Sequence, residues 1–153
     1  MTVNKTDYFN WQNAGAVAQK RYNTKSPNLV ALNDFLVKRF GGTNLGIYNK
    51  REVRSGGAPS SHSFGAALDF RYQTHNEATS KIIPWLVKNS KELGIQVIQD
   101  YVGCAIWTPG KGWRIVDKDG EFGQRWATWL HIETTKTDWG NKTRIESRGI
   151  ELP

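Results

Sequence analysis

The part of the chain that follows Ile95 alternates short apolar runs with turn signals, and this pattern restricts the fold more than any other feature. The turn signals are Pro109-Gly110, Lys111-Gly112 and Asp119-Gly120. They predict strands at residues 95–99, 103–107, 113–116 and 126–134. Because tight turns join antiparallel neighbours, we expect these strands to form an antiparallel sheet.

The first half of the chain has helical spacing. In residues 28–40 the apolar positions are Leu29, Leu32, Leu36 and Phe40, and the glycines at 41 and 42 are a C-terminal stop signal. Helical spacing returns in residues 76–93, where Asn76 is a candidate N-cap. Alternatively, that helix begins later and places Pro84 in its first turn.

Residues 46–54 and 66–72 are short and strand-like. Helices in the first half and hairpins in the second half predict an α+β fold, a mostly antiparallel sheet flanked by helices. A length of 153 residues fits one domain with one core, spanning residues 1–153. We expect the polar tail, residues 136–153, to be a surface extension.

The chain is basic, with 21 Lys and Arg against 14 Asp and Glu and a net charge of +7. This charge favours anionic partners, but the basic residues are scattered and no nucleic-acid motif is present, so no specific nucleic-acid partner is expected. No apolar run is long enough to cross a membrane. The polar N-terminus lacks a secretory signal, which predicts synthesis in the cytoplasm without a signal peptide.

A candidate metal site begins after the Gly/Pro/Ser-rich loop at residues 56–61. His62 follows this loop, Asp69 lies seven positions later in a strand-like run, and His131 lies in a distant one. Catalytic zinc takes three protein ligands of these types and keeps a fourth position open for water. From spacing alone, a surface pair or a core pair is the more frequent arrangement of a His and an Asp.

The residues around these ligands fit a longer pattern. Ser60, His62, Gly65, Ala67 and Asp69 match S-x-H-x-x-G-x-A-x-D at every fixed position. This string resembles the D-alanyl-D-alanine metallopeptidase family and its wider group, which includes lysostaphin-type peptidases and the hedgehog signalling domain. The resemblance implies a hedgehog-like fold, a Zn²⁺ cofactor held by His62, Asp69 and His131, and peptidoglycan peptide stems as the substrate.

The sequence most resembles the short peptidase domains in phage endolysins and actinobacterial cell-wall proteins. This resemblance therefore implies an enzyme that acts at the bacterial cell wall after release from the cell. Arg54, in the segment 53–57, resembles the family's arginine near zinc, which implies that it steadies the polarised carbonyl. We expect Ser60 and Trp129 to contact the substrate.

The family's usual catalytic base is absent from its position. The resemblance places an acid three residues before the third ligand, or a histidine two before it, but this chain has Thr128 and Trp129 there. Glu133 is the best substitute base and Glu121 the second, although either is as easily a plain surface carboxylate. The alternative function is a catalytically impaired, zinc-stabilised binding module for a wall peptide or a protein. His75 is expected to be an ordinary surface histidine.

Overall fold

The computed structural model describes residues 8–50, 59–116, 128–142, 145 and 149–153. Its helices, including 3-10 and π turns, are η2 (Trp11–Asn13), α1 (Gly15–Arg21), α2 (Pro27–Phe40), η3 (Ser61–Phe64), α3 (His75–Glu77), η4 (Ala78–Ile82), α4 (Ile83–Lys88) and α5 (Ser90–Leu93). Its strands are β1 (Thr43–Gly46), β2 (Ala67–Arg71), β3 (Ile95–Asp100), β4 (Ala105–Thr108), β5 (Gly112–Ile115) and β6 (Leu130–Thr134).

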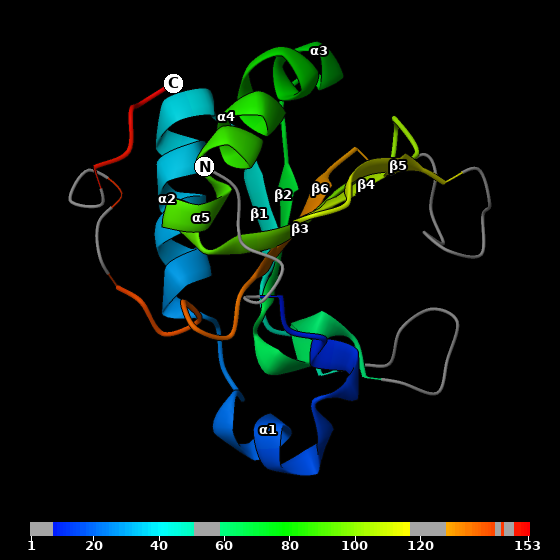
Figure 1. Cartoon of the computed structure of the whole chain (residues 1–153). Helices are drawn as coiled ribbons and strands as arrows, with labels where there is room; N and C mark the ends of the chain where they lie inside the picture. Colours follow the sequence, from blue (N-terminus) through cyan, green and yellow to red (C-terminus); the bar gives the residue numbers. More distant parts are fainter. Residues whose placement is uncertain (1–7, 51–58, 117–127, 143–144, 146–148) are drawn as a thin grey trace.

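The six strands form one antiparallel sheet in the order β1-β2-β6-β3-β4-β5. Helices α2, α4 and α5 lie together on one side of it, while the β4–β5 hairpin extends away from them (Figure 1). The predicted α+β class with a mostly antiparallel sheet is confirmed. Among the described residues, no helix is long and apolar enough to cross a membrane.

Helix α2 follows directly from its sequence. The Ser26 side chain caps it by accepting a hydrogen bond from the Leu29 N–H, and Pro27 occupies its first turn. It ends at Gly41, whose φ of 73° suits glycine. Its predicted apolar positions are all buried. They pack in the main core against the side chains on the face of the sheet that the helices cover. The prediction for residues 28–40 is confirmed to within one residue.

Two predicted elements differ from the structure. The strand expected at residues 46–54 is instead β1, Thr43–Gly46, and residues 51–58 lie outside the described part of the chain. Residues 47–49 leave the sheet because their backbone bonds to η3: the Asn49 N–H donates to the His62 carbonyl at 2.9 Å. The Ile47 carbonyl, in turn, faces the His62 ring.

The helix expected at residues 76–93 is divided into short pieces, α3, η4, α4 and α5. Its first N-cap is Thr74 rather than Asn76, because the Thr74 hydroxyl accepts from the Glu77 N–H at 3.1 Å. α4 begins at Ile83 with Pro84 in its first turn, which agrees with the alternative prediction of a later helix start. A proline lacks the N–H that a continuous helix would need at this point, and a π turn precedes it.

The described part of the C-terminal tail packs against the fold. Ile145 and Ile150 belong to the main core. Trp139 donates its indole N–H to the Phe64 carbonyl at 2.8 Å and packs on Tyr22. Trp139 therefore lies beside η3, and Ile145 and Ile150 add to the main core, so the tail contributes to the core as well as to the surface.

Candidate metal centre

His62 is held by a short, fully buried turn. Ser60 caps η3, because its hydroxyl accepts from the His62 N–H at 3.3 Å. The turn ends at Gly65 with a φ of 61°. A Cβ there would overlap the carbonyl oxygen of Thr24, so only glycine fits. The fixed serine and glycine of the sequence pattern therefore set the position of the first histidine.

Asp69 and His131 lie directly opposite each other on neighbouring strands β2 and β6. Facing residues of an antiparallel pair point to the same side of the sheet, so both side chains reach the face opposite α2. Ala67 lies opposite Glu133 in the same ladder and is fully buried. Its small side chain leaves space there for the Glu133 carboxylate.

The His62 ring is oriented by a backbone carbonyl. Its Nδ1 lies 3.0 Å from the Ile47 oxygen, a distance at which Nδ1–H donates, so Nε2 is the nitrogen left for another partner. Nε2 is buried and lies 3.2 Å from Asp69 Oδ2. A cation between them would satisfy both atoms.

The His131 ring is oriented by a carboxylate. Its Nε2 lies 3.0 Å from Glu133 Oε2, while its Nδ1 lies 3.2 Å from Asp69 Oδ1. Glu133 is itself held by Gln96, whose Nε2 lies 3.5 Å from Oε1. The pairing register shifts at Gln96, between Ile95 and Val97 of β3, and such a bulge re-aims a side chain.

Both carboxylates of this network are ionised because of the imidazoles. Burial works to raise the pKa of Asp69, but His131 and then His62 outweigh it and hold that pKa well below its usual range. Burial also works to raise the pKa of Glu133, and His131 lowers it below its ordinary value. For His131 burial lowers the pKa, yet hydrogen bonds to Asp69 and Glu133 raise it to about 9.

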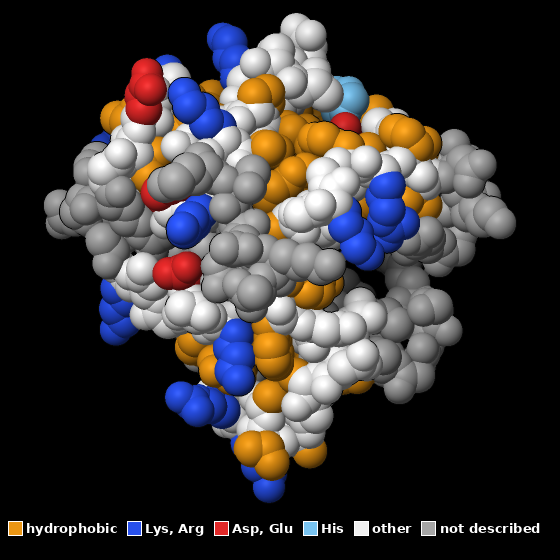
Figure 2. Space-filling view, in the orientation of Figure 1, with side chains coloured by type: hydrophobic (Ala, Val, Ile, Leu, Met, Phe, Trp, Pro, Cys, Tyr) orange, Lys and Arg blue, Asp and Glu red, His pale blue; other side chains and the backbone are white. Residues whose placement is uncertain are grey.

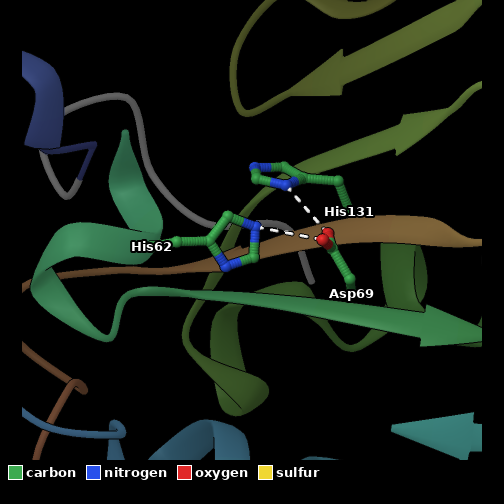
Figure 3. A group of neighbouring side chains, drawn as sticks. All are labelled: His62, Asp69 and His131. Carbon is green, nitrogen blue, oxygen red and sulfur yellow. Dashed lines mark hydrogen bonds and ion pairs between the residues drawn. The ribbon is translucent and has the colours of Figure 1, made fainter. Parts of the chain in front are cut away.

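His62, Asp69 and His131 together can hold a metal ion, since one donor atom from each lies within 4.8 Å of the others. Figure 3 shows the two rings converging on Asp69, from η3 and from β6. Each histidine has its second nitrogen at a carbonyl or a carboxylate, which is the usual environment of a metal-ligating histidine. The donor set therefore fits a metal, and the prediction of a metal site is confirmed to that extent. The identity of the metal stays a prediction.

The other predicted site residues have different positions. Arg54 and Glu121 lie outside the described residues, so their roles stay predictions. Thr128 is exposed. Trp129 is half-buried and packs on Tyr101, at a ring distance of 5.7 Å, in a cluster beside the site. The Ser60 hydroxyl caps η3, and its contact with substrate also stays a prediction.

Three features of the site were not predicted from the sequence: the Ile47 carbonyl, Gln96 and the partnership of Glu133 with His131. Only the partnership of Glu133 with His131 could have been found from the sequence, because residues two apart on a strand lie on the same face of the sheet. His75, expected to be an ordinary surface histidine, instead pairs with the buried Asp100 at 2.9 Å. That expectation was wrong because the pair joins two segments that are distant in the sequence.

The family described as "VldE, C-terminal domain" matches residues 23–126, about two thirds of the chain. The matched segment includes His62 and Asp69 and ends before His131. No curated protein and no solved structure matches the chain.

Proposed function

We propose that this chain, which belongs to the VldE C-terminal domain family, is a zinc-dependent peptidase that cleaves peptide-stem bonds of bacterial peptidoglycan. The observation that carries the proposal is the arrangement of His62, Asp69 and His131, two imidazoles and one carboxylate converging from three elements. Three ligands of these types are typical of catalytic zinc, whereas structural zinc usually has four. The choice of peptidoglycan as the substrate rests on the resemblance of the S-x-H-x-x-G-x-A-x-D string to the D-alanyl-D-alanine metallopeptidase family.

Access to the site supports catalysis over purely structural binding. The Asp69 side chain is 19% exposed, while those of His62 and His131 are 4% and 9% exposed. A metal at this point would be held by His62, Asp69 and His131, of which Asp69 is the most exposed. Zinc supplies a bound water that ionises near neutral pH and a Lewis acid for a carbonyl.

The chain's own residues would orient and anchor this chemistry. Ile47 and Glu133 fix the two imidazole rings so that His62 Nε2 and His131 Nδ1 face Asp69. Arg54 would steady the carbonyl oxygen of the substrate, as its resemblance to the family implies. The net charge of +7 would attract the enzyme to the anionic wall.

A non-catalytic, zinc-stabilised binding module is the second candidate, and one observation favours it. Glu133, the first candidate for the base, bonds to His131 Nε2, the nitrogen directed away from Asp69. A carboxylate used to orient a ligand is poorly placed to take a proton from water at the metal. Thr128 cannot act as a base in its place.

Digestion of purified peptidoglycan by the zinc-loaded chain, scored by released amino groups, separates the two functions. We expect slow release that is lost in Asp69→Asn. Thr128→Glu should raise the rate, because a positioned base contributes about 10²–10⁴-fold. Thr128→Gln is the matched control and should not raise it. Wall binding without release would favour the binding module, and a fast wild type slowed by Thr128→Glu would contradict this account of the site.

A further inference from the structure

A cavity of about 530 Å³, open to the surface, lies between α4 and the strands β3, β4 and β5. Its sheet side is formed by Asp100, Ala105 and Trp113, and α4 contributes Ile83 and Val87. A volume of this size is typical of small-molecule sites. Figure 2 shows hydrophobic side chains gathered between α4 and the β4–β5 hairpin.

This cavity lies on the face of the sheet opposite the metal centre. In β3, Gln99 faces His131 across the ladder, so the next residue, Asp100, points to the other side. Asp100 lies directly opposite Ala105, and Ala105 opposite Ile115, which places all three in one row on that side. The two sites are therefore separated by the sheet itself.

The helices leave the outer part of this face uncovered. Trp107 and Trp113 pair across β4 and β5, yet Trp107 is 3% exposed and Trp113 is 42% exposed. The ring of Trp113 is thus a flat apolar surface at the edge of the cavity. Large aromatic rings that remain accessible beside a cavity are frequent ligand contacts.

One polar group of the cavity is a buried carboxylate. Asp100 is 5% exposed, and His75 Nε2 lies 2.9 Å and 3.0 Å from its two oxygens. A carboxylate accepts about four hydrogen bonds, so Asp100 keeps acceptor capacity for a ligand. Gly103 permits this position, because a Cβ there would press against Asp100 Oδ2.

A donor without an acceptor lies next to this pair. The Tyr72 hydroxyl is buried and has no hydrogen-bond partner among the described residues. Its ring centre is 5.7 Å from that of His75. Burial, followed by the charge of Asp100, raises the pKa of Tyr72 to about 12, so this hydroxyl keeps its proton. Tyr72 and His75 lie outside the cavity lining, whose polar residues are Thr79, Lys88 and Asp100.

We propose that this cavity binds a neutral oligosaccharide, with one pyranose ring stacked on Trp113 and its hydroxyl groups donating to Asp100. A pyranose has an apolar C–H face and a rim of hydroxyls, which matches an exposed indole beside a carboxylate. Charged ligands fit less well, because the cavity is lined by one group of each sign, the Asp100 carboxylate and the Lys88 ammonium. The proposal does not rest on the metal centre or on the proposed peptidase activity.

The test is titration of the full chain with chitotriose and with maltotriose, two neutral sugars without a peptide stem, followed by NMR chemical shifts and calorimetry. We expect at least one sugar to bind, with shifts at Trp113 and residues 83–88. Trp113→Ala should weaken binding about tenfold or more, since truncating an aromatic anchor commonly costs that much. Asp100→Asn, which keeps the side-chain shape, should weaken it as well.

Two controls make the result specific. Ile115→Ala changes a 75%-exposed residue on the same strand and face but outside the cavity lining, and it should leave binding unchanged. Asp69→Asn should also leave binding unchanged, even if it abolishes metal binding. Failure of the wild type to bind either sugar would overturn the proposal. So would equal losses in Trp113→Ala and Ile115→Ala, or unchanged binding in a folded Trp113→Ala variant.

Discussion

At the scale of single residues, the metal centre depends on the groups that accept hydrogen bonds from its two histidine ligands. His62 and His131 each use one ring nitrogen for a fixed acceptor, Ile47 O and Glu133 respectively. The other nitrogen of each ring is thereby presented to Asp69. A histidine without such a partner would rotate and change tautomer, at a cost in metal affinity.

Glu133→Gln tests whether Glu133 orients His131. The amide still accepts a hydrogen bond but loses the charge, so we expect zinc affinity to fall about 10–100-fold. Affinity is measured by competition with a chromophoric chelator. Glu151→Gln is the matched control, because Glu151 is 83% exposed and pairs with Lys88 of α4, on the side of the sheet opposite the metal ligands. Unchanged zinc affinity together with lost hydrolysis would assign Glu133 the role of the base instead.

The stability of the metal-free chain should depend on pH through His131. Its pKa is about 9 in the folded state against an ordinary value of 6.5, so folding favours the protonated ring. This contribution is fully present below pH 6.5 and is lost as the pH rises through about 9.

We therefore expect the urea midpoint of the EDTA-treated chain to fall between pH 6.5 and pH 9. His131→Gln should be less stable at pH 6.5 and should show a smaller change across this window. A wild-type midpoint that rises with pH over the window would contradict the assignment.

At the scale of elements, the contacts of η3 explain why glycine follows His62 at the third position. The Gly65 carbonyl accepts from the Ser26 N–H at 2.9 Å, and its Cα faces the backbone of Thr24. The Ala66 carbonyl accepts from the Thr134 N–H, which joins the turn to β6. The turn that carries His62 is therefore fixed to the strand that carries His131.

Gly65→Ala should destabilise the fold by about 2–4 kcal/mol, because a left-handed backbone and an overlap with the Thr24 carbonyl act together. Gly140→Ala is the control: a Cβ there meets nothing within 4 Å, so its effect should be small. Urea unfolding measures both variants. Equal effects of the two substitutions would mean that the contact with Thr24 is unimportant.

Elements governed by local periodicity were predictable from the sequence, and contacts between distant segments were not. Helix α2 follows from its apolar spacing and its capping residues. The pairing of β2 with β6, which places Asp69 opposite His131, was implied only by the family resemblance, which makes both residues ligands of one ion. The predicted strand at residues 46–54 was wrong because Ile47 and Asn49 bond to η3, so that β1 ends at Gly46 instead of continuing the sheet. The bulge at Gln96 and the His75–Asp100 pair arise from tertiary packing, which no local pattern encodes.

At the scale of the whole molecule, the metal site joins the two parts of the fold. η3 packs against the N-terminal aromatic cluster through Phe64, which lies beside Trp11 at 5.5 Å. β2 and β6 belong to the sheet and the main core. An ion shared by His62, Asp69 and His131 would hold these two parts together, so its removal should affect the entire chain.

Zinc should therefore raise the thermal midpoint of the whole protein. A ligand at 100 times its Kd stabilises the folded state by about 2.7 kcal/mol, and in a chain of 153 residues each kcal/mol shifts the midpoint by roughly 2–4 °C. We expect a rise of about 5–10 °C over the EDTA-treated chain, with one zinc per chain by elemental analysis. Asp69→Asn removes a ligand while keeping the side-chain shape, and its midpoint should be nearly insensitive to zinc. An equal rise in wild type and Asp69→Asn would mean that zinc binds elsewhere, because a site built from His62, Asp69 and His131 cannot keep its affinity without the carboxylate that both imidazoles face.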